Sequence, residues 1–125
     1  MKESVVQKKI MKWLKEQGAY TRRVNSGKIK YEGRWIILGV KGTPDIAVTL
    51  NGHSIGVEVK KDAKELQAWN TQFKNWQKTG IITAYNERSY YQHREQNKIR
   101  EAGGYTFTVY SVDMLEKELK EFNLL

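Results

Sequence analysis

The feature that most constrains this chain is an Asn-Gly pair at positions 51 and 52, set between two runs of alternating side chains. Such a pair most favours a two-residue β-hairpin turn. With that turn the pairing follows by counting, so that Ile46 faces Val57. Because successive side chains of a strand point to opposite faces, one face of the hairpin is predicted to join the core. That face carries Ile46, Val48, Leu50, Ile55, Val57 and Val59.

The opposite face of the predicted hairpin sets two acids against each other. The register places Asp45 across from Glu58, where β-carbons are about 4.5–5.5 Å apart and like charges destabilise the pair. Lys60 points the same way, and the other side chains of this face are small: Ala47, Thr49, Ser54 and Gly56. Small side chains predict open space above the sheet, and a divalent cation with oxygen ligands would relieve the repulsion.

A structural interpretation of the same residues remains open. Asp45 would cap a turn after Pro44, Glu58 would lie exposed at a sheet edge, and Lys60 would pair with either acid.

The whole chain limits the classes of function. Its 125 residues predict one domain over 1–125. No apolar run could span a bilayer and no signal peptide is recognisable, so we expect a cytoplasmic protein without a membrane partner. The absence of cysteine excludes disulfides and thiolate metal sites. The sequence contains no glycine-rich phosphate-binding loop, so a nucleotide cofactor is not expected. His53 and His93 lack the spacing of a zinc site or catalytic triad and are interpreted as surface residues.

The positive charge is concentrated in the first third of the chain. The net charge is +8, and residues 1–43 contain 11 Lys and Arg against 3 Asp and Glu. Clustered cations favour a polyanion whose phosphates release counterions on binding, although a solvated surface is the alternative. The clusters comprise Lys8, Lys9, Lys12, Lys15, Arg22, Arg23, Lys28, Lys30 and Arg34.

Periodicity and stop signals predict the remaining elements. Helices are expected at 3–17, 63–78, 87–102 and 111–122, and strands at 19–24, 34–38 and 105–111 beside the 45–60 hairpin. A polar loop is expected to begin at 25–28. The elements together predict an α/β fold in which helices flank a small mixed central sheet.

Several short stretches resemble a known nuclease family. Pro44-Asp45 followed by Glu58-Val59-Lys60 looks like the PD-(D/E)XK signature. VNSG at 24–27, KGTPD at 41–45, EVKK at 58–61 and EAGGYTFTVYS at 101–111 together resemble the VRR-NUC domain, the virus-type replication-repair nuclease module. The resemblance covers almost the whole chain and is to stand-alone, phage-type members. It implies a restriction-endonuclease-like core and, for a phage-encoded protein, the host cytoplasm.

The resemblance also implies roles for individual residues. Asp45, Glu58 and the backbone carbonyl of Val59 would bind Mg²⁺ or Mn²⁺, and Lys60 would orient or activate the attacking water. Gln92 would hold Lys60 or a phosphate oxygen. Catalytic and DNA contacts are further expected from Glu3, at the start of the first helix, and from Asn25, Ser26, Lys28, Lys30, Arg34 and Lys41.

These assignments have alternatives. Gln92 would otherwise be a polar helix position, Glu3 a favourable charge at a helix N-terminus, and 24–27 a plain turn. The segment 63–87 is absent from compact family members, so Gln72 and Gln77 compete with Gln92. It carries one apolar helical stripe that suits either the core or a subunit interface: Leu66, Trp69, Phe73 and Trp76.

The residues and the resemblance together predict a metal-dependent, structure-specific endonuclease that hydrolyses DNA phosphodiesters. The resemblance implies 5′-phosphate products. Holliday (four-way) junctions or other branched DNA are the expected substrates. A homodimer is expected, with Trp69, Phe73 and Trp76 at its interface, because symmetric junction cutting needs two sites. A nuclease without branch preference and a non-catalytic DNA-binding module are the alternatives.

Overall fold

The computed structural model describes residues 1–24 and 27–125, with the backbone alone at 27–29 and 37–38. The predicted helices and strands are confirmed apart from small shifts at their ends. In chain order the elements are α1 (Glu3–Glu16), β1 (Tyr20–Arg23), β2 (Gly27–Tyr31), β3 (Arg34–Leu38), β4 (Ile46–Leu50), β5 (His53–Val59), α2 (Ala63–Thr79), α3 (Glu87–Glu101), β6 (Tyr105–Val109) and α4 (Val112–Glu121).

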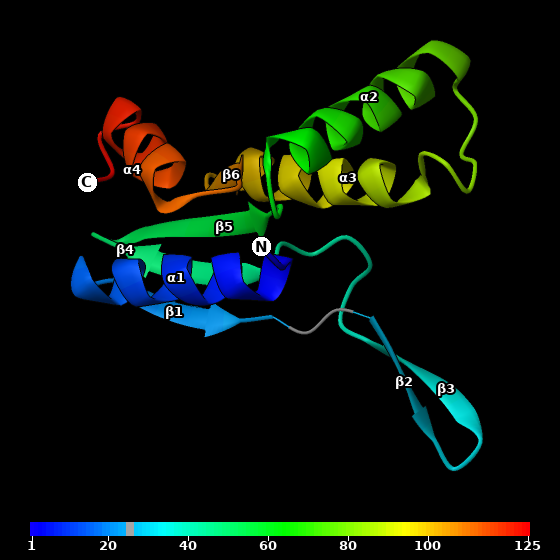
Figure 1. Cartoon of the computed structure of the whole chain (residues 1–125), viewed down its shortest axis with the longest axis horizontal. Coiled ribbons are helices and arrows are strands. Elements are labelled where there is room, and N and C mark those ends of the chain that lie inside the picture. Colours follow the sequence, from blue (N-terminus) through cyan, green and yellow to red (C-terminus); the bar gives the residue numbers. More distant parts are fainter. Residues whose placement is uncertain (25–26) are drawn as a thin grey trace.

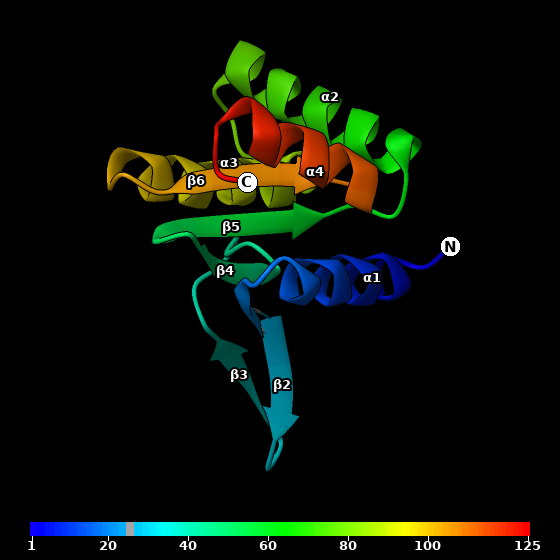
Figure 2. The same ribbon diagram turned by 90° about the vertical axis from the view of Figure 1, so that its left-hand side faces the viewer.

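A four-stranded mixed sheet in the order β1-β4-β5-β6 forms the centre of the fold. β4 runs antiparallel to both neighbours, and β6 runs parallel to β5. Helices α1 and α4 cover the apolar face, while α3 covers the other face and α2 lies against α3 (Figures 1 and 2). This is the predicted α/β fold. In the described part of the chain, no helix is long and apolar enough to cross a membrane.

The hairpin predicted from Asn51 and Gly52 is confirmed. Both residues have positive φ, 51° and 81°, as the two-residue turn requires. Ile46 pairs with Val57 in the counted register. Every residue of the predicted apolar face is buried, and Val6, Ile10 and Leu14 of α1 and Leu115 and Leu119 of α4 complete this core.

The open space predicted above Gly56 is not present, so that prediction was wrong. A β-carbon at Gly56 would lie 2.9 Å from Pro44 Cγ and 3.3 Å from Ile99 Cδ1. Pro44 belongs to the loop before β4 and Ile99 to α3. The small residue therefore allows α3 and the loop to approach the sheet closely, and the site is restricted to the end of the hairpin.

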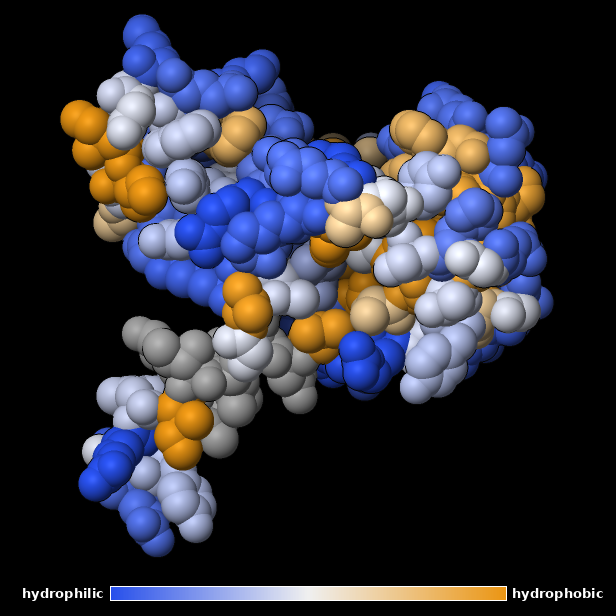
Figure 3. Space-filling model, turned by 180° about the vertical axis from the view of Figure 1, so that it is seen from behind, coloured by the Kyte–Doolittle hydropathy of each residue, from blue (hydrophilic) through white to orange (hydrophobic). Residues whose placement is uncertain are grey.

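The prediction that a polar loop begins at 25–28 was also wrong for residues 27 and 28, which belong to β2. β2 pairs with β3 in a separate two-stranded sheet whose turn residues, Glu32 and Gly33, have φ values of 49° and 77°. This hairpin lacks the regular apolar alternation that marks a core strand, which is why its first strand was missed. Figures 1 and 3 show that it extends away from the body of the protein.

The aromatic stripe of α2 packs within the chain. Trp69 is buried, and the rings of Trp69 and Phe73 stack with His93 at centroid distances of 3.9 Å and 3.6 Å. Trp76 contacts Tyr90 edge-on. The stripe therefore contributes to packing between α2 and α3, while Phe73 and Trp76 remain partly exposed, and the prediction that it forms a subunit interface stays a prediction. The interpretation of His93 as a surface residue was wrong, and burial lowers its pKa.

Candidate active site

The predicted catalytic residues come from separate elements whose ends meet near the N-terminus (Figure 1). Glu3 begins α1, Asp45 precedes β4, Glu58 lies in β5 and Lys60 directly follows it. Gln92 reaches the same place from the middle of α3. The charges of Asp45 and Lys60 both act on Glu3, so the fold brings together residues that are far apart in the sequence.

Glu58 is a buried carboxyl group that accepts no hydrogen bond from an N–H or O–H donor among the described residues. Glu58 is only 1% exposed, and neither of its carboxylate oxygens has a hydrogen-bond donor in the described part of the chain. Burial, followed by the charge of Asp45, raises the pKa of Glu58 well above its usual value. Asp45 is held in place by the backbone N–H of Val59, which donates to Asp45 Oδ2 at 2.8 Å. Unpartnered carboxylate oxygens in this setting are suited to a cation.

Lys60 is buried next to the two acids, and a hydrogen bond to Gln92 orients its ammonium group. The residue is 2% exposed, and Nζ donates to Gln92 Oε1 at 3.1 Å. The same oxygen accepts from Trp69 Nε1 at 2.6 Å, and Lys60 Nζ lies 5.2 Å from the centroid of the Trp69 ring. Burial is the main cause that lowers the pKa of Lys60. Of the three candidate glutamines, Gln92 is the one that contacts Lys60.

Two contributors to this region were missed from the sequence. Burial, followed by the interaction with the Glu65 carboxyl group, raises the pKa of Glu3 to about 7. Glu65 follows Asp62 at the spacing of a helix capping box, so its sequence context indicated only a cap. Trp69 was assigned to the apolar stripe, and no sequence signal indicated that its N–H reaches Gln92.

The donor set fits a metal ion that keeps several waters. Within the described residues, no three imidazole or carboxylate side chains lie close enough together to hold an ion by themselves. Mg²⁺ is commonly bound by one or two carboxylates, with waters and substrate phosphates as the other ligands. Asp45 and Glu58, joined by the Val59 carbonyl that the resemblance implies, match that pattern. The unpartnered oxygens of Glu58 are the observation that supports this fit.

The predicted DNA contacts are distributed differently. Asn25 and Ser26 lie outside the described residues, and Lys28 lies in β2 where the backbone alone is described. Lys30 and Arg34 are exposed on the β2–β3 hairpin. Lys41 pairs with Glu87 and lies 4.4 Å from the centroid of the Tyr91 ring.

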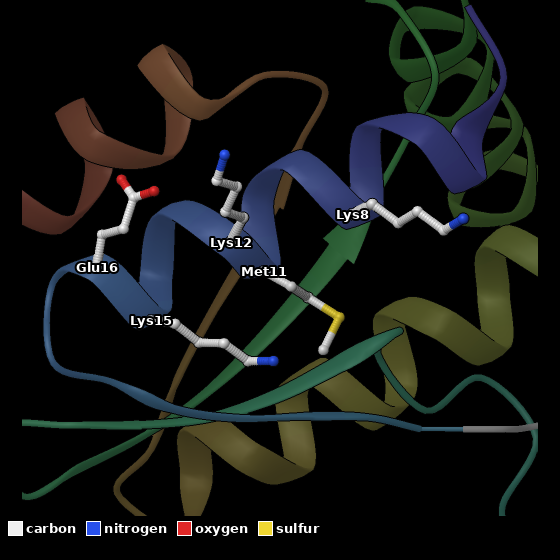
Figure 4. Close-up of a pocket in the computed structure, with 5 residues that line it drawn as sticks. All are labelled: Lys8, Met11, Lys12, Lys15 and Glu16. Carbon is white, nitrogen blue, oxygen red and sulfur yellow. The ribbon is translucent and has the colours of Figure 1, made fainter.

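A basic face of α1 adds to the positive surface. Lys8, Lys12 and Lys15 line a shallow depression together with Met11 and Glu16 (Figure 4). All five residues belong to one helix, and the three amino groups in Figure 4 spread along it rather than converge on one point. This surface suits an extended polyanion better than a small ligand.

Comparison with known proteins agrees with this geometry. No family model matches the chain, and neither does any curated protein. A solved structure described as a VRR_NUC domain covers 95% of this chain and 94% of its own length, with 28% sequence identity and a TM-score of 0.53. The mixed sheet flanked by helices agrees with the PD-(D/E)XK-like core that the sequence predicted. The likeness supports the VRR-NUC domain that the sequence motifs predicted, and thus a nuclease-type function.

The raised pKa values predict how stability depends on pH. Because the folded protein holds protons on Glu3 and Glu58 more tightly than the unfolded chain does, their stabilisation is complete below about pH 4.5 and is lost as the pH rises. The loss runs through about pH 7 for Glu3 and through the raised pKa of Glu58 for that residue. In the presence of a chelator, we expect these two groups to lower the melting temperature between about pH 5.5 and pH 8. Mn²⁺ should restore stability at the higher pH because it binds the folded state.

Thermal melting of wild type and of Glu58→Gln at both pH values isolates this effect. The difference between the two proteins should increase with pH, since the neutral amide has no charge to bury. A difference that stays constant from acid to alkaline pH would contradict the predicted titration.

Proposed function

We propose that this protein is a metal-dependent endonuclease that hydrolyses DNA phosphodiesters. The observation that carries the proposal is the carboxyl group of Glu58, buried beside Asp45 with no hydrogen-bond donor among the described residues, together with the oriented ammonium of Lys60. VRR-NUC domains are nucleases, which implies DNA as the substrate, and nucleases of this family generally use divalent metals. A hydrolase therefore agrees with both the site and the likeness.

Each residue would have a defined task in this reaction. Asp45, Glu58 and the Val59 carbonyl would hold Mg²⁺ or Mn²⁺, which polarises the phosphate and lowers the pKa of bound water. Lys60 would donate a hydrogen bond to the attacking water or to a phosphate oxygen, where negative charge develops. Water would attack the phosphorus and the bond from phosphorus to the 3′ oxygen would break. The products would be a 3′-hydroxyl and the 5′-phosphate that the resemblance implies. Glu3 would bind a water at the edge of the site.

The finer parts of the proposal concern the substrate and the assembly. We infer branched DNA, including four-way junctions, as the substrate, and a homodimer as the assembly that supplies two cutting sites. The α2 stripe packs against α3 and leaves Phe73 and Trp76 partly exposed as the candidate dimer surface. A single domain over 1–125 and a cytoplasmic location remain predictions.

Cleavage of a panel of end-labelled DNAs tests this function. The panel contains a four-way junction, a fork, a linear duplex of the same sequence and a single strand, each with Mg²⁺, with Mn²⁺ and with a chelator. We expect metal-dependent nicks near the branch point. Equal cutting of junction and duplex would favour the general nuclease, and binding without cutting would favour the DNA-binding module.

The contact between Trp69 and Gln92 predicts a specific defect. Trp69→Phe removes the N–H but retains an aromatic ring, so Gln92 would hold Lys60 less firmly. We expect single-turnover cleavage to slow about tenfold, as for the loss of one positioning hydrogen bond, with unchanged affinity for DNA. Trp76→Phe is the matched control, because Trp76 lies on the same helix and packs against Phe73 and Tyr90. Equal slowing by both variants would indicate a packing effect.

A further inference from the structure

The hairpin formed by β2 and β3, residues 27–38, stands apart from the rest of the protein, and we refer to it as the arm. Its two strands form a sheet of their own and do not join the central sheet. Figures 1 and 2 show it extending away from the body of the protein. A two-stranded hairpin is only marginally stable in water without a packing partner. This arm is therefore suited to contact something other than its own chain.

The register of the arm combines an aromatic ring with a cation in two successive cross-strand pairs. Lys30 pairs with Trp35, and Tyr31 pairs with Arg34. Because successive pairs of a hairpin point to opposite faces, each face of the tip carries one ring and one positive charge. Trp35 is 67% exposed and Tyr31 is 60% exposed. Glu32, in the turn, is the single acid in residues 27–38.

The root of the arm is attached at the candidate active site. On the β1 side, the N–H of Val24 donates to the carbonyl of Asp45 at 2.8 Å. On the other side, a β-carbon at Gly42 would lie 2.3 Å from the Tyr91 carbonyl oxygen, so the returning chain lies directly against α3. Asp45 and Gln92 are thus next to both ends of the arm. A DNA strand that reaches the acids would pass close to it.

We propose that the arm enters branched DNA, where Trp35 and Tyr31 stack on unpaired bases while Lys30 and Arg34 bind the flanking phosphates. Rings that stack on bases beside cations that follow the backbone are the combination used by proteins that bind unpaired nucleic acid. In a continuous duplex each base is covered by its neighbours, so stacking favours a branch point. This inference rests on the proposed DNA nuclease function and identifies how the branch is recognised.

The composition of the arm argues against a second copy of this chain as the occupant. The centres of protein–protein interfaces are depleted in charged residues, particularly lysine. In the arm each exposed ring lies opposite a cation, and the paired residues share a face. Two such arms would bring like charges together, whereas DNA phosphates would neutralise them.

Binding in the presence of a chelator separates this recognition from cleavage. Fluorescence anisotropy would compare a four-way junction, a fork and a linear duplex. We expect Trp35→Ala to weaken binding to the junction and the fork about tenfold or more, with little effect on the duplex, while Trp35→Phe retains most of the affinity. Tyr85→Ala is the matched control, since Tyr85 is 54% exposed but lies between α2 and α3.

The cations of the arm should behave differently from the rings. Replacing Lys28, Lys30 and Arg34 together by Ala should weaken binding to every DNA and reduce the salt dependence of the affinity. A 2-aminopurine base placed at the branch should lose its fluorescence on binding wild type, and lose less of it on binding Trp35→Ala. Circular dichroism should show that all variants retain the wild-type fold.

Three outcomes would overturn the inference. If Trp35→Ala binds branched DNA as tightly as wild type and cleavage persists, the arm does not read the branch although the nuclease function stands. If wild type neither binds nor cuts any DNA in the panel, the proposed function fails together with the inference. If Trp35→Ala changes the mass measured by light scattering but not DNA affinity, the arm is an interface between copies of this chain.

Discussion

Glu58→Gln should abolish DNA cleavage while leaving the protein folded and able to bind DNA. The variant removes the negative charge whose two oxygens lack hydrogen bonds in the described chain, so divalent binding should weaken strongly. A metal ion that polarises the phosphate contributes several kcal/mol, and its loss should slow single-turnover cleavage by about a thousandfold or more. Calorimetric titration with Mn²⁺ and cleavage under single-turnover conditions would measure the two effects.

The same substitution, although it removes activity, should increase the stability of the metal-free protein. Burying a carboxylate without a partner destabilises the metal-free protein, so the neutral amide should raise the free energy of unfolding at neutral pH. Asp45→Asn should also be inactive, but with a smaller gain in stability because Asp45 Oδ2 already accepts from Val59. Glu116→Gln, on the surface of α4, is the control with wild-type activity. Undiminished cleavage by either site variant would refute the metal assignment.

Lys60→Ala should be inactive and yet still bind the metal ion. Its ammonium is the positive group that the structure orients beside Glu58, and losing a positioned donor at developing charge typically costs about a hundred- to a thousandfold in rate. Trp69 would still donate to Gln92, so the surrounding contacts would persist. Single-turnover cleavage should therefore show a lower rate, while Mn²⁺ calorimetry should show an unchanged metal affinity.

A second variant distinguishes the charge from the packing. Because Lys60 is buried, Lys60→Ala also leaves a cavity, whereas Lys60→Met keeps an apolar chain of similar length. We expect Lys60→Met to be as inactive as Lys60→Ala and closer to wild type in stability. Lys61→Met, at the exposed neighbouring position, should cleave normally. Cleavage by Lys60→Met at the wild-type rate would remove Lys60 from the mechanism.

The homodimer is the prediction most changed by the structure. It was based on an aromatic stripe that helical spacing placed on one face of α2. The spacing was right, but a helical wheel does not show what covers the stripe, and here Tyr90 and His93 of α3 do. Trp69 is buried, whereas Phe73 and Trp76 keep part of their surface exposed, and light scattering remains the direct measurement of the dimer.

The sequence by itself determined the features that depend on near neighbours. The turn at Asn51-Gly52 and the alternation of side chains along β4 and β5 follow from local backbone chemistry. They place Asp45 opposite Glu58 without any long-range information. The family resemblance then attached chemistry to those acids and to Lys60.

Tertiary structure alone decided the environment of that chemistry. The sequence allowed Glu58 to be exposed at a sheet edge, whereas in the fold it is 1% exposed and has no hydrogen-bond donor among the described residues. Trp69 meets Gln92 because α2 packs on α3, and Trp35 lies opposite Lys30 because the arm folds back at Glu32 and Gly33. The first contact joins residues that are distant in the chain, and the second depends on a turn that the sequence analysis did not predict. The local periodicity of a sequence carries no information about either contact.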